Sequence, residues 1–381
     1  MHRIKITFIC FFLLVISSAN KAFSQMLPLS ENTTVSVITC GNGAEMYSLF
    51  GHTAIHITDK QNHIDEVYNY GAFDFNTPNF VLKFIKGDLQ YFATNSSYND
   101  FLYEYQYDKR SVDEQVLNLS QVQKQQLFDD LNATLVSEER FYTYKFIDKN
   151  CTTMVINIIN KTLGKEVIVK TTDKEKTYRE ILYPYFKDHF YEKLGISIIF
   201  GKKVDLKGEQ LFLPAELQES IANIQYNKEP ICQKNTTILE FKKEKTPISW
   251  WNNFYSFSLL LLIVVIVNNN RIYMVYFFLM GLLGLFLTFV GFYSLHKELE
   301  YNYNILLFNP ALLFLIYFYL KNNRKWMYLI ALLALLSIAI YLVIMMNKIH
   351  LVIVLPLIIT SLIGLVKLAI QNKNQGTAVK P

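Results

Sequence analysis

Two residues in the N-terminal part of the chain, Cys151 and His52, have the types and positions that suit nucleophilic catalysis. Asn150 precedes the cysteine and is a favoured N-cap, so Cys151 is predicted at the first position of a helix. The helix dipole stabilises a thiolate there and lowers the pKa of the thiol. A thiol nucleophile needs a base. His52 begins the apolar stretch 52–58, a predicted strand that would hold an imidazole rigidly.

A catalytic imidazole is commonly oriented by a third polar side chain. Three residues are within plausible range of His52, namely His63, Asn69 and Asp74. Asn69 lies on the next predicted strand and is our first choice. We therefore predict Cys151 as nucleophile, His52 as general base and Asn69 as the residue that orients the imidazole.

The spacing of His52 and His56 resembles that of a metal-binding pair, but it suits a helix and not a strand. On a strand the two rings would stand about 13 Å apart. The sequence contains no His-Glu-x-x-His, Gly-x-Ser-x-Gly, Gly-x-Gly-x-x-Gly or Cys-x-x-Cys motif. We predict neither a metal site nor a cofactor.

The chain has four cysteines, one of which, Cys10, would leave with the signal segment described below. An odd number, Cys40, Cys151 and Cys232, then remains in an oxidising compartment. The simplest expectation is a bridge between Cys40 and Cys232 and a free thiol at Cys151. The alternative is that Cys40 is buried beside the site.

Strand and helix signals alternate through the part of the chain that must position these residues, which predicts the α+β fold class. The predicted strands are residues 33–40, 52–58, 66–71, 89–94, 112–119 and 142–147. The predicted helices are residues 44–50, 77–86, 120–139, 151–163, 177–190 and 214–224.

Residues 1–24 have the pattern of a secretory signal peptide. A basic start is followed by the apolar run 6–16 and by the small residues Ala22 and Ser24 that flank a cleavage site. The mature chain would begin near Gln25. The alternative is an uncleaved anchor, although the run is shorter than the ~18 residues of a span.

The C-terminal third contains five apolar segments of about the length that crosses a bilayer. These are residues 250–267, 272–295, 305–320, 326–346 and 351–370. With residues 25–249 outside, the inner connectors and tail hold seven basic and no acidic residues, which follows the positive-inside rule. The sequence thus predicts an exported domain (25–241), a tether (242–249) and an all-α five-helix transmembrane domain (250–381).

The charge distribution excludes some functions. Residues 25–249 hold 25 basic and 30 acidic residues, so the exported part is mildly acidic and no nucleic-acid partner is expected. No Asp, Glu or Arg lies in the middle of a predicted span, which argues against a pump.

Several strings of the sequence resemble the Lnb N-terminal periplasmic domain family, exported domains of Bacteroidota. They are TCGNGAEMYSLFGHTAIHI (39–57), VYNYGAFDFNTPNF (67–80), NCTTMVINII (150–159), IFGKKVD (199–205), LFLPAEL (211–217) and YNYNILLFNP (301–310). The family name derives from an accessory protein for a lacto-N-biosidase, and the resemblance therefore implies a possible helper role.

FGHTAIHI followed about 100 residues later by NCTT is also similar to permuted papain-like hydrolases, which include the lecithin:retinol acyltransferase-like enzymes. In these a His begins a strand and a later Asn-Cys begins a helix. The resemblance implies a permuted papain-like exported domain that cuts or transfers acyl groups.

We therefore expect a membrane-anchored periplasmic thiol-dependent acyl hydrolase or acyltransferase, which acts on an amide or ester that is linked to the envelope or to lipid. The alternatives are a non-catalytic accessory or chaperone module for an exported client protein, and a structural envelope protein. The expected location is the inner membrane, multi-pass, with the C-terminus in the cytoplasm. The outer loop 296–304 is expected to lie beneath the exported domain.

Overall fold

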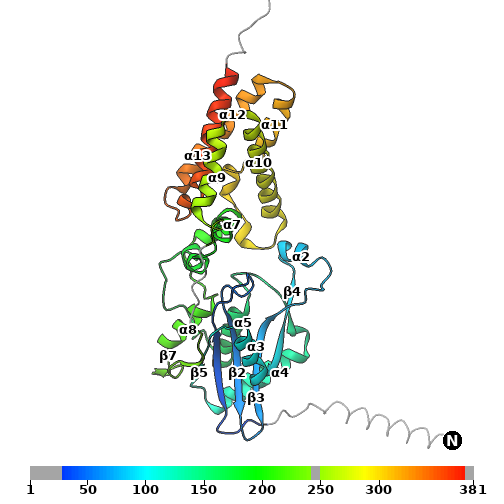
Figure 1. Cartoon of the computed structure of the whole chain (residues 1–381). Helices are drawn as coiled ribbons and strands as arrows, with labels where there is room; N and C mark the ends of the chain where they lie inside the picture. Colours follow the sequence, from blue (N-terminus) through cyan, green and yellow to red (C-terminus); the bar gives the residue numbers. More distant parts are fainter. Residues whose placement is uncertain (1–27, 242–248, 374–381) are drawn as a thin grey trace, which may run out of the picture.

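The computed structural model describes residues 28–241 and 249–373. Within these ranges a mixed α/β domain lies at one end of the molecule and a helical bundle at the other (Figure 1). The predicted signal segment 1–24 lies outside the described residues, as does nearly all of the predicted tether 242–249.

A seven-stranded antiparallel sheet forms the centre of the first domain, with the strand order β6-β4-β3-β2-β1-β5-β9. Its strands are β1 (Thr34–Cys40), β2 (His52–Asp59), β3 (Ile64–Ala72), β4 (Gln90–Ser97), β5 (Val112–Val116), β6 (Phe141–Thr143) and β9 (Thr236–Leu239). The short strands β7 (Gln225–Tyr226) and β8 (Glu229–Pro230) pair separately. The paired strands predicted from 52–58 and 66–71 are β2 and β3, in register with Ala54 opposite Asn69.

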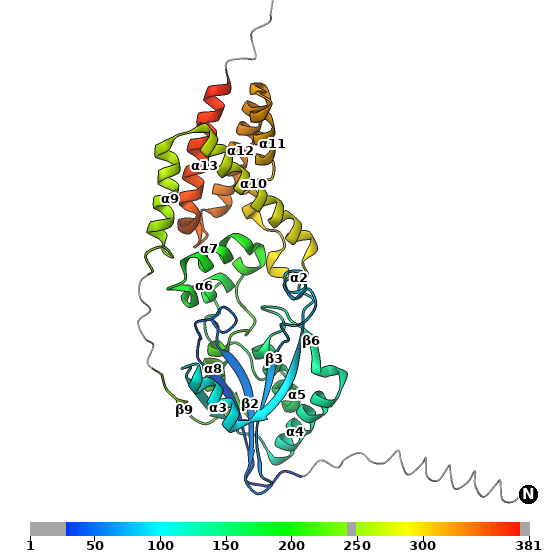
Figure 2. The same ribbon diagram turned by 45° about the vertical axis from the view of Figure 1, so that its right-hand side comes forward.

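The two faces of the sheet pack against different helices (Figure 2). Side chains of α4 (Gln121–Val136), α5 (Cys151–Leu163) and α8 (Pro214–Asn223) form the larger core with one face. α3 (Tyr98–Tyr107), which the sequence patterns did not predict, covers the other face. Alternation along each strand explains this division, because neighbouring residues such as Val37 and Ile38 enter different cores.

Some predicted elements differ from the observed ones. Residues 44–50 form turns and not a helix. α2 (Phe80–Lys86) begins three residues after the predicted start, because Asn79 adopts a left-handed conformation with φ 58°. The predicted helix 177–190 is split into α6 (Tyr178–Leu182) and a 3₁₀ turn that contains Pro184. A proline cannot donate the backbone hydrogen bond that a continuous helix needs.

The five apolar segments each contain a helix: α9 (Phe254–Val267), α10 (Asn270–Tyr293), α11 (Leu312–Leu320), α12 (Arg324–Met345) and α13 (Leu351–Asn372). By length and composition, three of the described helices can cross a membrane, namely α10, α12 and α13. α9 has 14 residues and α11 only nine. The third segment is interrupted before α11 by Pro310, so the predicted count of five spans stays a prediction.

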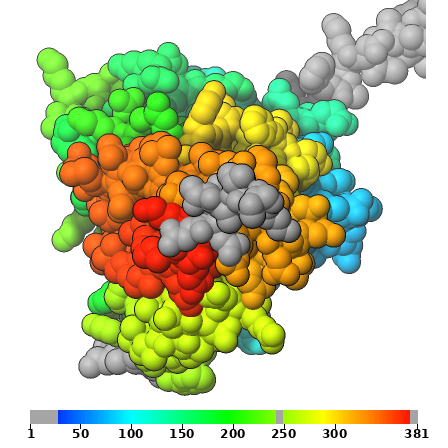
Figure 3. All heavy atoms as spheres, turned by 90° about the horizontal axis from the view of Figure 1, so that it is seen from above, coloured from blue at the N-terminus to red at the C-terminus, as the bar shows by residue number. Residues whose placement is uncertain are grey.

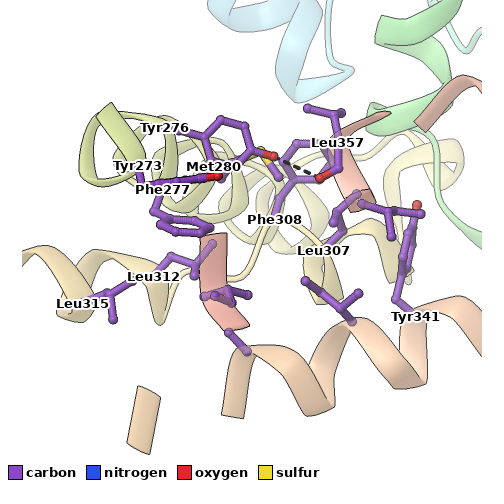
Figure 4. Close-up of a cluster of buried hydrophobic side chains, with 14 of the residues drawn as sticks. Tyr273, Tyr276, Phe277, Met280, Leu307, Phe308, Leu312, Leu315, Tyr341 and Leu357 are labelled. Atoms are coloured by element: carbon purple, nitrogen blue, oxygen red, sulfur yellow. Dashed lines mark hydrogen bonds between the residues drawn. The ribbon is translucent and has the colours of Figure 1, made fainter. Parts of the chain in front are cut away.

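The bundle has its own apolar core, to which every one of these helices contributes (Figure 4). The Tyr276 hydroxyl of α10 donates a hydrogen bond to the Leu357 carbonyl of α13 at 3.1 Å, so the one polar atom of this buried ring is paired. Gly284 lets the backbone of Phe308 approach α10, because a Cβ at this position would overlap the Phe308 carbonyl oxygen.

The loop after α10 lies against the α/β domain, as expected for residues 296–304. The Gly201 N–H donates to the Glu298 carbonyl at 2.7 Å. The buried side chain of Asn304 donates to the carbonyls of Ser197 and Ile198 in α7 (Phe190–Ile199), at 3.1 and 2.9 Å. These bonds join the α/β domain to the bundle.

Candidate active site

The start of α5 is fixed by a dense set of hydrogen bonds. The Asn150 side chain accepts from the Thr153 N–H at 3.1 Å, and the Thr153 hydroxyl accepts from the Asn150 N–H at 2.8 Å, a reciprocal capping box. The Asn150 amide also donates to the carbonyls of Phe146 and Phe212. This N-cap, predicted from Asn150, therefore holds Cys151 at the first helical position.

β2 is joined to the same end of α5. The buried hydroxyls of Thr53 and Thr152 hydrogen-bond at 3.1 Å, and the Thr53 backbone lies close enough to Cys151 to lower the pKa of its thiol. Each of these threonines follows a predicted catalytic residue in the sequence. The bond between them therefore sets the distance between His52 and Cys151.

The structure brings His52, Asn69 and Cys151 together. His52 Nε2 donates to the Asn69 carbonyl oxygen at 3.1 Å, since that oxygen can only accept. The imidazole also lies close enough to Cys151 for each group to shift the pKa of the other. Because Asn69 occupies Nε2, Nδ1 is the ring nitrogen left for an interaction with the sulfur. All three side chains are partly buried and not fully enclosed.

The thiol and the imidazole stabilise each other's charged forms. Burial opposes ionisation of Cys151, but the His52 charge and hydrogen bonds from His52, Thr53 and Thr152 hold its pKa below the ordinary value. Burial also opposes protonation of His52, but the Cys151 thiolate and hydrogen bonds to Cys151 and Asn69 raise its pKa. The two shifts have the signs that favour a thiolate on Cys151 and a protonated His52.

Gly71 lies over this pair at an irregularity in β3. The strand register shifts between Tyr70 and Ala72, and Gly71 has φ 123°. A Cβ at this position would stand 3.6 Å from His52 Cε1 and 3.8 Å from Cys151 Cβ. Glycine adopts this positive φ without strain and keeps the space beside the sulfur open.

Three tyrosine rings lie in the neighbourhood of Cys151. Tyr91, Tyr142 and Tyr144 are each close enough to interact electrostatically with Cys151. Burial raises the pKa of Tyr91 to about 12, so its phenol is neutral at physiological pH. Tyr91 stacks on Tyr144 at 4.4 Å between ring centroids and contacts Phe73 at 5.0 Å. A cluster of aromatic rings thus lies in the neighbourhood of Cys151.

The other candidate residues have different environments. His63 lies in the turn at the far end of the β2–β3 hairpin, and Asp74 caps the exposed turn that follows β3. His56 is buried and bonded to Glu114 at 2.7 Å and to Asp65 at 2.8 Å. Among the described residues no group of His, Cys, Asp and Glu is arranged to hold a metal ion.

The predicted disulfide between Cys40 and Cys232 is wrong. Both cysteines, like Cys151, are free. Cys40 belongs to the core on the α3 face of the sheet, whereas Cys232 packs in the core on the α5 face, so the sheet separates them. Burial raises the pKa of Cys40 to about 12 and also raises that of Cys232. The alternative expectation, that Cys40 is buried beside the site, fits better, because Cys40 pairs with His52 in the β1–β2 ladder.

Sequence reasoning missed Gly71, the two threonines and the three tyrosines near Cys151. The glycine had a signal, because an isolated glycine within a strand pattern indicates a bulge or a close approach. Thr53 and Thr152 each follow a candidate residue directly, but nothing local to either segment indicates that their hydroxyls meet. The tyrosines come from β4, β6 and the segment after β6, and only the sheet order brings them together.

Comparison with protein-family models gives two matches that together cover more than three quarters of the chain. Residues 21–183 match the Lnb N-terminal periplasmic domain, and residues 240–375 match the Lnb transmembrane domain. Comparison with curated proteins and with solved structures gave no match. The matches agree with the resemblance seen in the sequence and with the division into an α/β domain and an apolar helical bundle. The chain therefore belongs to the Lnb N-terminal periplasmic domain family and is a membrane protein with an N-terminal periplasmic part.

Proposed function

We propose that the periplasmic domain is a thiol-dependent acyl hydrolase or acyltransferase that acts on an amide or ester linked to the envelope or to lipid. The observation that carries this proposal is that His52, hydrogen-bonded to Asn69, lies beside Cys151 at a helix N-terminus. The chain order, with His52 before Cys151, also fits a permuted papain-like fold. A non-catalytic module has no need for a thiol held beside an oriented imidazole.

In the first half of the reaction the Cys151 thiolate attacks the carbonyl carbon and forms a carbon–sulfur bond. The oxyanion that develops faces the start of α5. There the Cys151 N–H has no acceptor within its helix and is available to bind the oxyanion. The His52 imidazolium then gives its proton to the leaving alcohol or amine as the carbon–oxygen or carbon–nitrogen bond breaks, which leaves an acyl thioester on Cys151.

In the second half an acceptor attacks the thioester. Neutral His52 removes a proton from water, an alcohol or an amine, which bonds to the acyl carbon while the Cys151 sulfur leaves as the thiolate. Water as acceptor gives a hydrolase, and an amine or alcohol gives a transferase. The hydrogen bond from Nε2 to Asn69 keeps Nδ1 directed at the reacting atoms throughout.

Two features support a lipid-linked substrate over a free soluble one. A cluster of aromatic rings lies in the neighbourhood of the thiol, which suits an acyl chain. The domain is also held at the outer ends of the helices by the hydrogen bonds from Gly201 and Asn304. The reacting carbonyl would therefore have only a short way to travel from a membrane to the sulfur.

Acyl-enzyme formation tests this proposal. The full chain in lipid nanodiscs is treated with a chromogenic medium-chain acyl ester, and the intact mass and the released alcohol are followed. We expect a thioester on Cys151 that hydroxylamine removes, and its loss in C151A and H52A. Cys232→Ala is the matched control, because it removes a buried thiol of raised pKa that lies outside the β1–β2 ladder. If the wild type and C151A acylate equally, the enzyme proposal fails and the accessory-module alternative gains.

We propose that all five helices cross the inner membrane, with the C-terminus in the cytoplasm. The connectors around Tyr303 and His350, whose side chains hydrogen-bond at 3.2 Å, meet the periplasmic domain, and Lys348 lies 3.6 Å from Asp205. α9 and α11 are short, but the interruption before α11 has its polar groups paired. Ser337 of α12 donates to the Leu306 carbonyl at 2.7 Å, and irregular backbone is tolerated at membrane depth where protein satisfies it.

Reporter fusions test this topology. A reporter after Pro381, or inserted in residues 268–271 or at Asn322, should show cytoplasmic activity. The site at Asn322 follows α11 and tests whether that short helix crosses. A periplasmic signal at Asn322 alone would exclude α11 as a span, and one after Pro381 would overturn the orientation.

A further inference from the structure

The segment 73–86, which leads from β3 through α2, exposes a cluster of large apolar side chains. Phe75 is 68% exposed, Val81 65%, Leu82 64% and Phe84 44%. None of the residues of α2 is buried. A seven-residue helix with no buried side chain has little stability of its own in water. Exposed apolar clusters of this kind mark a surface that meets a partner or a membrane.

The position of α2 is fixed by the outer end of α10. The Leu295 N–H donates to the Lys86 carbonyl at 2.7 Å, and the Ser294 hydroxyl donates to the Ile85 carbonyl at 2.7 Å. His296 Nε2 donates to the Phe84 carbonyl at 3.0 Å. These donors directly follow Tyr293, the last residue of a helix long enough to span a membrane. α2 therefore lies beside the end of α10 (Figure 1), at the depth where a bilayer crossed by α10 would end.

The bundle does not cover this segment on the membrane side. Figure 3 looks down on the bundle, and the light-blue region of the chain near residue 80 projects beyond the outline of the helices. A flat bilayer around the bundle would extend over the same area. Lys83 and Lys86 lie in the last turn of α2. Lys86 is paired with Asp88, and Lys83 is a long basic side chain that can reach lipid phosphates.

The segment is also connected to the candidate site. The Phe75 ring lies 5.1 Å from that of Phe80 and 4.8 Å from that of Phe73. Phe73 contacts Tyr91 at 5.0 Å, and Tyr91 is near enough to Cys151 to interact with it electrostatically. A continuous series of aromatic rings thus extends from the exposed helix toward the site.

We propose that segment 73–86 is an interfacial element that inserts Val81, Leu82 and Phe84 among the acyl chains of the outer leaflet. The partner is bilayer lipid, because the segment is hydrogen-bonded to the end of a candidate span and lies at its depth. Bilayer contact would bury the apolar cluster that water otherwise meets. The proposed contact with the bilayer does not depend on the proposed function. Only a route along the aromatic rings from the segment to Cys151 rests on that function.

Fluorescence quenching by lipid tests the surface directly. The full chain, with Trp250, Trp251 and Trp326 replaced by Phe, carries one tryptophan at residue 82 (L82W) and is reconstituted into vesicles of phosphatidylcholine brominated on its acyl chains. We expect quenching of at least twofold relative to vesicles without bromine. Tyr103→Trp is the matched control: Tyr103 is 71% exposed on α3, away from the bundle, and its replacement should not be quenched.

Each outcome decides the proposal. Quenching of L82W no greater than that of Y103W overturns it. Emission from L82W that is blue-shifted but unquenched also overturns it, since a protein partner or a second copy would then cover the segment. The variant that lacks Trp250, Trp251 and Trp326 is replaced if it fails to fold. In that case Phe84→Trp is made in the chain that keeps its three tryptophans, and its quenching is compared with that of the unmodified chain. The readout needs no catalysis, so a failed acyl-enzyme experiment and a failed quenching experiment are separate results.

Discussion

Replacement of His52 by alanine removes the imidazole beside the Cys151 sulfur and leaves the thiol in a partly buried site. Without its partner, only the opposing effect of burial and the two threonine contacts remain. Cys40 indicates what burial does to a thiol in this domain, because its pKa is raised from 9.0 to about 12. We therefore expect the pKa of Cys151 in H52A to rise from below 9.0 towards that of Cys40.

The size of the effect follows from the thiolate fraction. At pH 7 a thiol of pKa 9 is about 1% ionised, and each further unit lowers the fraction about tenfold. A rise of three units therefore costs about 1000-fold in thiolate. The more basic thiolate is the better nucleophile by about threefold per unit, which returns about 30-fold. Alkylation of Cys151 at pH 7 should fall by up to about 30-fold in H52A.

The assay is iodoacetamide modification of the full chain in nanodiscs, followed by peptide mass spectrometry. Cys40 and Cys232 are internal references, because both are buried thiols with raised pKa values. The wild-type rate should rise as pH increases through the lowered pKa of Cys151 and then level off, whereas the H52A rate should still rise above pH 9. H63N, in an exposed turn, is the control. Equal rates for wild type and H52A at pH 7 would refute the interaction between His52 and Cys151.

Four further predictions follow from named contacts. Asn69→Ala removes the 3.1 Å partner of His52 and should lower the acylation rate about tenfold while the alkylation rate of the thiol changes less. Gly71→Val forces a branched residue into φ 123° beside the thiol and should abolish acylation in a protein that still binds lipid vesicles. Asp59→Asn weakens charge-assisted bonds to the N-terminal segment and should cost about 3 kcal/mol of unfolding free energy by denaturant titration; a loss below about 1 kcal/mol contradicts it. Burial opposes ionisation of Asp59 but its hydrogen bonds hold the pKa below 3.8, so the stabilisation is present above pH 3.8 and is lost as the pH falls through the folded pKa. Asn304→Ala leaves buried carbonyls of α7 without donors and should speed proteolysis between the two domains, whereas unchanged cleavage would show that the junction does not depend on it.

Local patterns were sufficient for several features because the determining interactions are local. The start and end of α5 follow from the Asn150 cap and from Gly164, which has φ 71°. β2 and β3 follow from two β-branched or aromatic stretches on either side of a polar turn. The apolar segments of the bundle follow from composition alone. Asn69 could be proposed because the register of a hairpin restricts which residues can approach the head of the neighbouring strand.

Other features failed because they depend on contacts between distant segments. The cysteine count suggested a bridge, but parity carries no information about which face of a sheet each residue joins. α3 has a weak apolar pattern and becomes a helix that buries Phe101 and Tyr105 only because the sheet is there to receive them. The helix predicted at 177–190 was too long, since the restraint of Pro184 on hydrogen bonding outweighed the apolar pattern.

The sequence by itself determined that this chain has an exported α/β part and an apolar helical part, and that Cys151 begins a helix, because signal, hydropathy and capping patterns act over short stretches of chain. Tertiary structure alone decided that His52 and Asn69 reach the thiol, that Cys40 and Cys232 stay apart, and that α2 lies beside the end of α10. These arrangements join residues 17 to more than 200 positions apart. The physical reason is that the pKa of a thiol and the environment of a helix are set by whatever the folded chain places within a few ångströms.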